Sequence, residues 1–260
     1  MFPDTIVVPL DGSEFAARAV PVANAIARQR GGRLLLMTAR WDHASAEARA
    51  YLEKVAADHT DVDVSTLVIE DRPAPAAIQL VVGQAPGRIV CMTTHGRGRA
   101  RWALLGSVAE VVVREASDSV ILVGRHCRDE WPDRLQRMLV AVDGSTPEPA
   151  VLPHALAWAR ALDLEVHVAT VVHPLDAAPV DASISAITDR ATSEGLSVEA
   201  HIVRSSFPAG ALADCAASLG IDLIAMSSHA RTGAARFALG SVTIGVTGLA
   251  GCAVLVQKAD

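Results

Sequence analysis

The segment RIVCMTTHGRGRARWALLGSVAEVVV (residues 88–113) recurs as LIAMSSHARTGAARFALGSVTIGV (residues 223–246), and this duplication decides the fold. In both copies an apolar run leads into a loop with arginine and glycine, and Gly-Ser then opens a helical pattern. Likewise, TIVVPLDGSEFAARAVPVANAIA (residues 5–27) resembles MLVAVDGSTPEPAVLPHALAWA (residues 138–159). The copies lie about 130 residues apart, which suits a domain and is too long for a solenoid repeat. The sequence therefore predicts two tandem copies of one domain.

The joint between the copies is expected at GRHCRDEWPDRL (residues 124–135), a polar stretch that contains a proline. Polar segments with proline are typical of domain boundaries. We therefore assign residues 1–128 to the first domain and residues 134–260 to the second.

Strand and helix patterns alternate in each copy. In the first, strands are expected at residues 5–10, 33–39, 62–70, 88–93 and 119–123, with helices at 14–30, 44–59, 74–84 and 106–115. In the second, strands are expected near 138–142, 165–172, 197–203, 221–227 and 252–257, with helices near 148–162, 181–194, 208–219 and 240–249. Apolar strands separated by helices indicate a parallel sheet covered on both faces. Each copy is therefore predicted to be a doubly wound α/β domain with a five-stranded parallel sheet, which binds ligands at the carboxyl ends of its strands.

Composition narrows the classes of function. Hydrophobic residues make up 51% of the 260 residues and charged residues 20%, which excludes intrinsic disorder. The formal net charge of −6 argues against nucleic-acid binding, which draws its affinity from a basic face. Lys54 and Lys258 are the only lysines, so a phosphate-gripping lysine has just two candidates.

The sequence also argues against a membrane protein. The longest apolar stretch, residues 244–256, is shorter than the roughly 20 residues that span a bilayer, and the first residues lack the pattern of a signal peptide. The cysteines are scattered, as expected of reduced thiols: Cys91, Cys127, Cys215 and Cys252. We therefore expect a cytoplasmic protein with neither membrane nor nucleic-acid partners. No zinc site is expected, because His126-Cys127 is the only adjacent pair of histidine or cysteine residues and no second pair lies at metal spacing.

The loop after the fourth strand has the parts of a phosphate cradle. Gly96 and Gly98 allow the backbone to approach a ligand or to adopt a positive φ. Gly106-Ser107 opens a helix whose free N–H groups favour an anion, and Ser107 adds a hydroxyl. Positive charge comes from Arg97, Arg99 and Arg101. The second copy has Ala230 in place of Gly96, with Arg231, Gly233, Arg236 and Gly240-Ser241.

These residues resemble the universal stress protein family. Its ATP-binding members have the pattern Gly-x2-Gly-x9-Gly-Ser/Thr after the fourth strand and an aspartate at the end of the first. Gly96, Gly106 and Ser107 match the pattern, and Asp11 and Asp143 match the aspartate. The resemblance covers both copies and implies a tandem member with a Rossmann-like fold of the adenine nucleotide alpha hydrolase type.

Two departures make the copies unequal. Thr93 stands where the pattern has its first glycine, and the second copy has Ser227 and Ala230 at the two leading glycine positions. Alanine is disfavoured if that position needs a positive φ. The first copy is therefore expected to be the better ATP site, and the second a weak one.

The resemblance implies which residues surround the nucleotide. Asp11, with Pro9 beside it, would meet the adenine or ribose, Thr38 and Ala39 would line the base pocket, and Met92 and Thr93 would border the ribose. Gly96, Gly98, Gly106, Ser107 and Val108 would wrap the triphosphate through backbone N–H groups and one hydroxyl. The counterparts in the second copy are Asp143, Met226, Ser227, Gly240, Ser241 and Val242. Magnesium or manganese would bind the phosphates.

Each of these residues also has a structural interpretation. Asp11 and Asp143 can serve as turn or N-cap residues, and Ser107 and Ser241 can cap helices. His95 and His229 are expected to be structural or solvent-facing rather than catalytic, and Trp102 to pack rather than stack on a base. The arginines of the loop suit a solvated loop or a partner protein as well as a phosphate.

Other chemistries lack their motifs. The chain has no GxxxxGK[ST], no GxGxxG after the first strand and no GxSxG elbow. We expect no dedicated enzyme, and at most weak ATPase activity. Three functions stay open: an ATP-binding stress or regulatory protein, a nucleotide-free scaffold that acts by protein contacts, and an enzyme or carrier for another small ligand.

The last strand of each copy bears on assembly. Residues 119–123 and 252–256 are short and apolar and are expected at sheet edges, where an unpaired strand invites pairing. In the family that this chain resembles, fifth strands commonly pair between domains. We therefore expect the two copies to pair with each other as an internal pseudo-dimer. Two whole chains can in addition form a homodimer.

Overall fold

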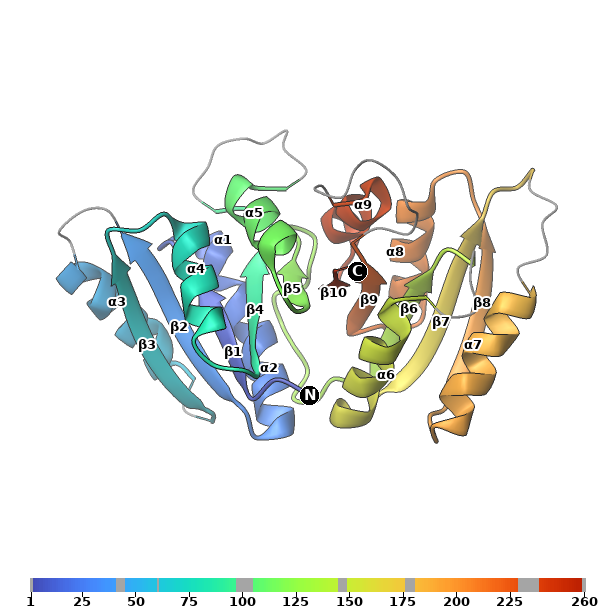
Figure 1. The fold of residues 1–260 in the computed structure, drawn as a ribbon, viewed down its shortest axis with the longest axis horizontal. Coiled ribbons are helices and arrows are strands. Elements are labelled where there is room, and N and C mark those ends of the chain that lie inside the picture. The colour runs from blue at the N-terminus through green and yellow to red at the C-terminus, as the bar shows by residue number, and fades with distance from the viewer. Residues whose placement is uncertain are drawn as a thin grey trace.

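The computed structural model describes residues 2–40, 45–59, 61–96, 105–144, 149–175, 181–228 and 239–258. These residues form one ten-stranded sheet in the order β3-β2-β1-β4-β5-β10-β9-β6-β7-β8, with helices on both faces (Figure 1). Within each half all the strands are parallel. The predicted duplication of a doubly wound α/β unit is confirmed.

The first half contains five strands and five helices among the described residues. Its strands are β1 (Thr5–Pro9), β2 (Arg33–Arg40), β3 (Asp63–Glu70), β4 (Arg88–Thr93) and β5 (Val120–Val123). Its helices are α1 (Glu14–Ala17), α2 (Ala19–Arg30), α3 (Ser45–Ala57), α4 (Ala74–Gly83) and α5 (Ser107–Glu115).

The second half repeats this order. Its strands are β6 (Arg137–Val142), β7 (Glu165–Val172), β8 (Val198–Arg204), β9 (Leu223–Ser227) and β10 (Ala253–Gln257). Its helices are α6 (Val151–Leu162), α7 (Asp181–Ser193), α8 (Pro208–Ser218) and α9 (Ser241–Leu249).

The two halves join through their last strands, as predicted. β5 and β10 pair antiparallel, with Leu122 opposite Val254 and Val120 opposite Val256. Beside this pair, the buried Ser119 hydroxyl donates a hydrogen bond to the side-chain oxygen of Gln257. Because each strand satisfies the other's free edge, the sheet has no unpaired strand at its centre.

Both hydrophobic cores extend across the joint. One core contains residues of α2, α3, α6 and α7, such as Leu52 and Ile187, and α2 contacts α6 directly. The other contains residues of α4, α5, α8 and α9, such as Ile78 and Val246. In Figure 1, α2 and α6 lie at the lower end of the molecule, and α5 and α9 lie at the upper end. The halves therefore share two cores, one on each face of the sheet.

One predicted helix is divided in two. We expected a single helix over residues 14–30, but α1 ends at Ala17 and α2 begins at Ala19. Pro21 explains the break, because proline has no N–H to donate to the Ala17 carbonyl and its ring would collide with that carbonyl. At the break, the Arg18 guanidinium donates to the carbonyl oxygens of Arg125 and Cys127 in the segment between the halves.

In the described part of the chain, no helix combines the length and the apolar character that a bilayer crossing requires.

Candidate functional site

The order of the strands places a switch point in each half. From β1 the chain proceeds outward to β2 and β3, and then returns to β4 on the other side of β1. Crevices of ligand-binding α/β sheets lie at such a point, outside the carboxyl ends of the strands. Asp11 follows β1 and the glycine loop follows β4, so the two sequence features meet at this point.

Asp11 has a structural role in the turn after β1. One of its carboxylate oxygens, Oδ1, accepts hydrogen bonds from the Ser13 backbone N–H at 2.9 Å and from the Ser13 hydroxyl at 2.6 Å. Ser13 in turn accepts from the N–H of Ala16 at 3.1 Å and is the N-cap of α1. The turn interpretation of Asp11 is therefore confirmed, while the cap of the helix is Ser13.

Gly96 brings the loop after β4 against Asp11. A Cβ atom at position 96 would lie 2.4 Å from Oδ2 of Asp11, a distance that real Cβ atoms do not show. The φ of Gly96 is outside the left-handed region, so a positive φ, the condition under which alanine would be disfavoured at this position, is not met in the first half. The missing side chain serves close approach instead.

The end of β4 fixes the start of the loop. Thr93 is buried, and its hydroxyl donates to the His95 carbonyl at 2.7 Å. The Thr94 hydroxyl lies 3.0 Å from Nδ1 of His95, whose ring meets the Phe15 ring edge-on. His95 therefore packs against the fold, as its structural interpretation predicted.

The other end of the loop returns to Thr94, the residue that follows β4. The Gly106 N–H donates to the Thr94 carbonyl at 2.7 Å, and a Cβ on Gly106 would lie 2.8 Å from that oxygen. The expectation that the Gly106 amide is free for a ligand is therefore corrected, because the fold already uses it. Gly106 is the N-cap of α5, so Ser107 does not cap the helix but is its first residue.

The first turn of α5 supplies the remaining donors. Backbone N–H groups at the first helical positions have no acceptor within their own helix, and the helix dipole favours an anion there. Ser107 is exposed and Val108 is half-buried. These two residues therefore place amides and a hydroxyl at the switch point.

The residues expected around the base come from neighbouring strands. Pro9 in β1 lies opposite Met37 in β2, so Thr38 and Ala39 follow at the end of that strand. Thr38 and Met92 are buried, while Pro9 and Ala39 are half-buried. The structure thus brings Pro9, Asp11, Thr38, Ala39, Met92, Thr93, Gly96, Gly106, Ser107 and Val108 to one end of the sheet. Their contact with a nucleotide stays a prediction.

The second half builds the same frame. The Gly240 N–H donates to the Ser228 carbonyl at 2.8 Å, and Gly240 caps α9, which begins at Ser241. The Thr243 hydroxyl donates to the carbonyl of Ser227 at 3.0 Å. Around this frame, Met226 is buried, and Asp143, Ser241 and Val242 are exposed. The helix N-terminus is therefore present in both halves.

Several predicted residues lie outside the described part of the chain. In the first half they are Arg97, Gly98, Arg99, Arg101 and Trp102. In the second half they are His229, Ala230, Arg231, Gly233 and Arg236.

Two residues of the frame were missed by the sequence reasoning. Thr94 and Ser228 provide the carbonyl oxygens that accept from Gly106 and Gly240. The duplication offered the signal, since both copies have a second hydroxyl residue after the fourth strand (Thr93-Thr94 and Ser227-Ser228).

Comparisons with known proteins agree on a single family. The sequence profile of the universal stress protein family matches residues 3–124 and again residues 134–258. A universal stress protein of Thermus aquaticus is 34% identical over 134 residues, which is 46% of this chain and 97% of that protein. One of Mycobacterium tuberculosis is 33% identical over 134 residues, and that match spans 45% of this chain and 44% of its relative.

A solved structure shares the fold of the whole chain. The crystal structure of a universal stress protein from Archaeoglobus fulgidus has a TM-score of 0.73 at 19% identity, covering 98% of this chain and 96% of that one. At this identity the likeness concerns the fold alone. The two profile matches, which together span nearly the entire sequence, decide the assignment: the chain belongs to the universal stress protein family and holds two copies of its domain.

Proposed function

We propose that this protein binds ATP at the switch point of its first half and acts as a nucleotide-dependent regulator in the response to stress. Nucleotide bound at this end of the sheet would change a surface that a partner protein can read. The observation that supports this best is that the short segment after β4 contacts both features: Thr94 accepts from Gly106, the N-cap of α5, and Gly96 lies against the Asp11 carboxylate.

The donors at this point suit a triphosphate. The amides of Ser107 and Val108 and the Ser107 hydroxyl offer hydrogen bonds to phosphate oxygens at the positive end of the helix dipole. The loop has no lysine, so backbone groups and the arginines at positions 97, 99 and 101 would replace it. Magnesium or manganese would bind mainly through the phosphates, because Mg²⁺ commonly keeps its waters and few protein ligands.

The two halves should differ in affinity. Gly96 allows the loop to lie against the Asp11 carboxylate, at a distance that leaves no room for a Cβ. The second half has Ala230 at the matching position of the sequence, with Asp143 as the matching carboxylate. We therefore propose that the first half holds ATP and that the second binds it weakly.

The sharpest test removes one amide without disturbing the helix. Proline is favoured at the first position of a helix, and Gly106 has φ −72° and ψ 151°, the extended conformation that a residue before proline adopts. Ser107→Pro therefore removes one N–H and the hydroxyl, while Ser107→Ala removes the hydroxyl only. Substitution of Gly106 itself would be a poor test, because a Cβ there collides with the Thr94 carbonyl.

Isothermal titration with ATP and Mg²⁺ gives the readout. A hydrogen bond to a charged group contributes about 1.5–3 kcal/mol, so Ser107→Pro should weaken ATP binding by roughly 10- to 100-fold. Ser241→Pro is the matched variant, since Gly240 has φ −61° and ψ 146°, and it should leave the main binding event unchanged. Equal effects of the two variants would refute the asymmetry, and absence of heat from the wild type at millimolar ATP would favour the nucleotide-free scaffold.

A further inference from the structure

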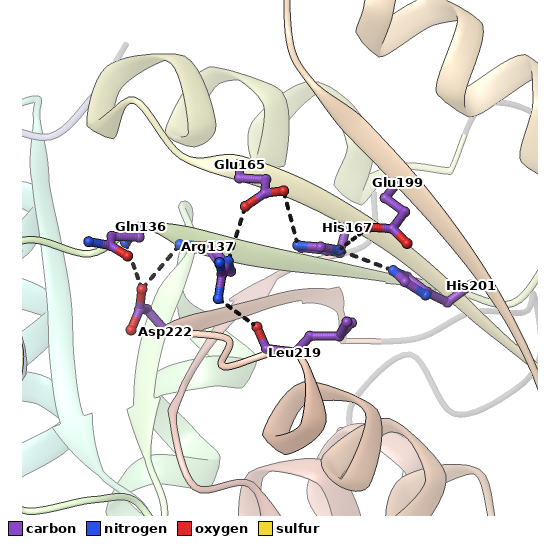
Figure 2. A network of polar contacts seen from close by, with 8 residues as sticks. All are labelled: Gln136, Arg137, Glu165, His167, Glu199, His201, Leu219 and Asp222. Carbon is purple, nitrogen blue, oxygen red and sulfur yellow. Dashed lines mark hydrogen bonds and ion pairs between the residues drawn. The ribbon is translucent and has the colours of Figure 1, made fainter.

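A cluster of two histidines and a glutamate lies on the outer strands of the second half. His167 comes from β7, and Glu199 and His201 come from the edge strand β8 (Figure 2). Nδ1 of His167 lies 3.1 Å from Nε2 of His201 and 3.8 Å from a carboxylate oxygen of Glu199. One ligand atom from each of the three residues lies within 4.8 Å of the others.

We propose that His167, Glu199 and His201 form a binding site for a divalent transition-metal ion, with zinc as the best match. Two imidazole nitrogens and one carboxylate oxygen are a ligand set that Zn²⁺ uses, leaving a position for water. The Glu199 side chain is 65% exposed, so an ion and its water can reach the site from solvent.

The observed spacing is close to that of a bound ion. With metal–ligand distances of about 2.0–2.2 Å, two ligand atoms of a tetrahedral site stand roughly 3.3–3.6 Å apart. The distances from Nδ1 of His167 to the other two ligand atoms, 3.1 Å and 3.8 Å, bracket this range. Each of these two distances is therefore within a few tenths of an ångström of the spacing that a bound ion sets, and the three ligand atoms all lie within 4.8 Å of one another.

The other nitrogen of His167 has the environment of a metal-ligating histidine. Its Nε2 is buried, makes no hydrogen bond within the described structure, and lies 3.9 Å from a carboxylate oxygen of Glu165. Figure 2 shows Glu165 between His167 and Arg137, whose guanidinium lies 3.0 Å from the other carboxylate oxygen. Histidine ligands of metals commonly direct their second nitrogen at a carboxylate in this way.

The first half shows that the fold does not need these three residues. In the first half, Leu35 of β2 pairs with Ser65 of β3, and Met37 pairs with Leu67. At the equivalent places of the second half, His167 of β7 pairs with Glu199 of β8, and Ala169 pairs with His201. Leu35, Ser65 and Leu67 thus occupy the equivalent positions of an equivalent sheet. The ligand set is specific to the second half, where it would tie the edge strand β8 to β7.

The test is a titration of the full chain with Zn²⁺ after treatment with a chelator. We expect one Zn²⁺ per chain, and Co²⁺ in its place should give the visible absorption of a tetrahedral site. His167→Leu and His201→Leu install the residues of the first half and should fold, but each should weaken Zn²⁺ binding by roughly tenfold or more.

Two further variants separate this site from surface binding. His154→Leu removes an exposed histidine of α6 and should leave the titration unchanged. Glu165→Gln should keep one ion per chain but lower its affinity by about 10- to 100-fold, as loss of an orienting carboxylate does. The proposal is overturned if the wild type takes up no Zn²⁺, if His201→Leu binds as well as the wild type, or if His154→Leu loses as much.

Discussion

The carbonyl oxygen of Thr247 occupies the space in which a side chain on Gly124 would begin. An ideal Cβ on Gly124 would lie 1.9 Å from that oxygen and 3.1 Å from the carbonyl carbon. Gly124 directly follows β5 of the first half, and Thr247 belongs to α9 of the second. The halves therefore approach each other here at backbone distance, which only glycine allows.

Gly124→Ala should destabilise the whole chain. The methyl group cannot be accommodated by a side-chain rotation, because its neighbour is backbone, so α9 must move away from the end of β5. Overpacking of this kind costs about 1–3 kcal/mol, and both shared cores would be disturbed. Chemical denaturation of the variant, followed by circular dichroism, measures the loss in free energy of unfolding.

Gly248→Ala is the matched control. This glycine is the next residue of α9 and has open space where its Cβ would stand. Alanine is favoured over glycine inside a helix by up to about 1 kcal/mol, so stability should stay the same or rise. If Gly124→Ala were equally harmless, the close contact between the halves would not exist in solution.

Much of the fold could be predicted from periodicity. The apolar run of residues 88–93 became β4 with the predicted bounds, and residues 165–172 became β7. Pairing between the last strands was also foreseen, since short apolar edges such as Val120–Val123 need a partner. The break at Arg18 was not predicted, because the apolar spacing of residues 14–30 continues through Pro21. This helical spacing outweighed the single proline, which indicates a break.

The candidate site could be located from the sequence, but its hydrogen bonds could not. The pattern of glycines pointed to Gly96 and Gly106 without telling what each glycine approaches. In the structure Gly96 makes room for the carboxylate of Asp11, and Gly106 makes room for the carbonyl of Thr94. Contacts of this kind join segments that are distant along the chain, so periodicity and spacing carry no information about them.

Gly96→Ala should weaken ATP binding by the first half. The Asp11 carboxylate is held by two hydrogen bonds from Ser13 and cannot simply rotate away from a new Cβ. Either the turn or the loop must shift by a few tenths of an ångström or more, and the donors of α5 then lose their alignment with the phosphates. We expect a loss of about tenfold in isothermal titration, which is roughly 1.4 kcal/mol.

Ala230→Gly should act in the opposite sense. It restores glycine at the sequence position that matches Gly96, so a second, weaker ATP binding event should become stronger. Titration of the double variant Ser107→Pro/Ala230→Gly isolates this event from the first-half site. Unchanged binding would show that the alanine is not what weakens the second half.

Asp222 should be among the most costly carboxylates to remove. It is 5% exposed and accepts hydrogen bonds from the backbone N–H groups of Gln136 at 2.6 Å and Arg137 at 3.1 Å, and from the Arg128 guanidinium (Figure 2 shows the first two residues). Asp222→Ala leaves these donors without their acceptor, so we expect a loss of about 3–5 kcal/mol in the free energy of unfolding.

Asp129→Ala provides the comparison for this carboxylate. Asp129 lies in the segment between the halves, next to the Arg128 that Asp222 binds, and forms an ion pair with Arg18 at 2.7 Å, but its side chain is 79% exposed. Pairs of this kind contribute about 0–1 kcal/mol because solvent screens them. Similar losses for both variants in denaturant titrations would argue against Asp222 as an anchor of the segment.

The cysteines should differ sharply in their reactivity. Burial raises the pKa of Cys127 to about 11 and that of Cys252 to about 12, and it raises the pKa of Cys91 as well. Cys215 is half-buried on α8, and burial raises its pKa too, but iodoacetamide can reach it. Since the thiolate is the reactive form, folded protein at pH 8 should be alkylated first at Cys215, and faster as the pH rises. Peptide mass spectrometry should find the other three labelled only after denaturation; early labelling of Cys127 would mean that the segment between the halves opens in the native state.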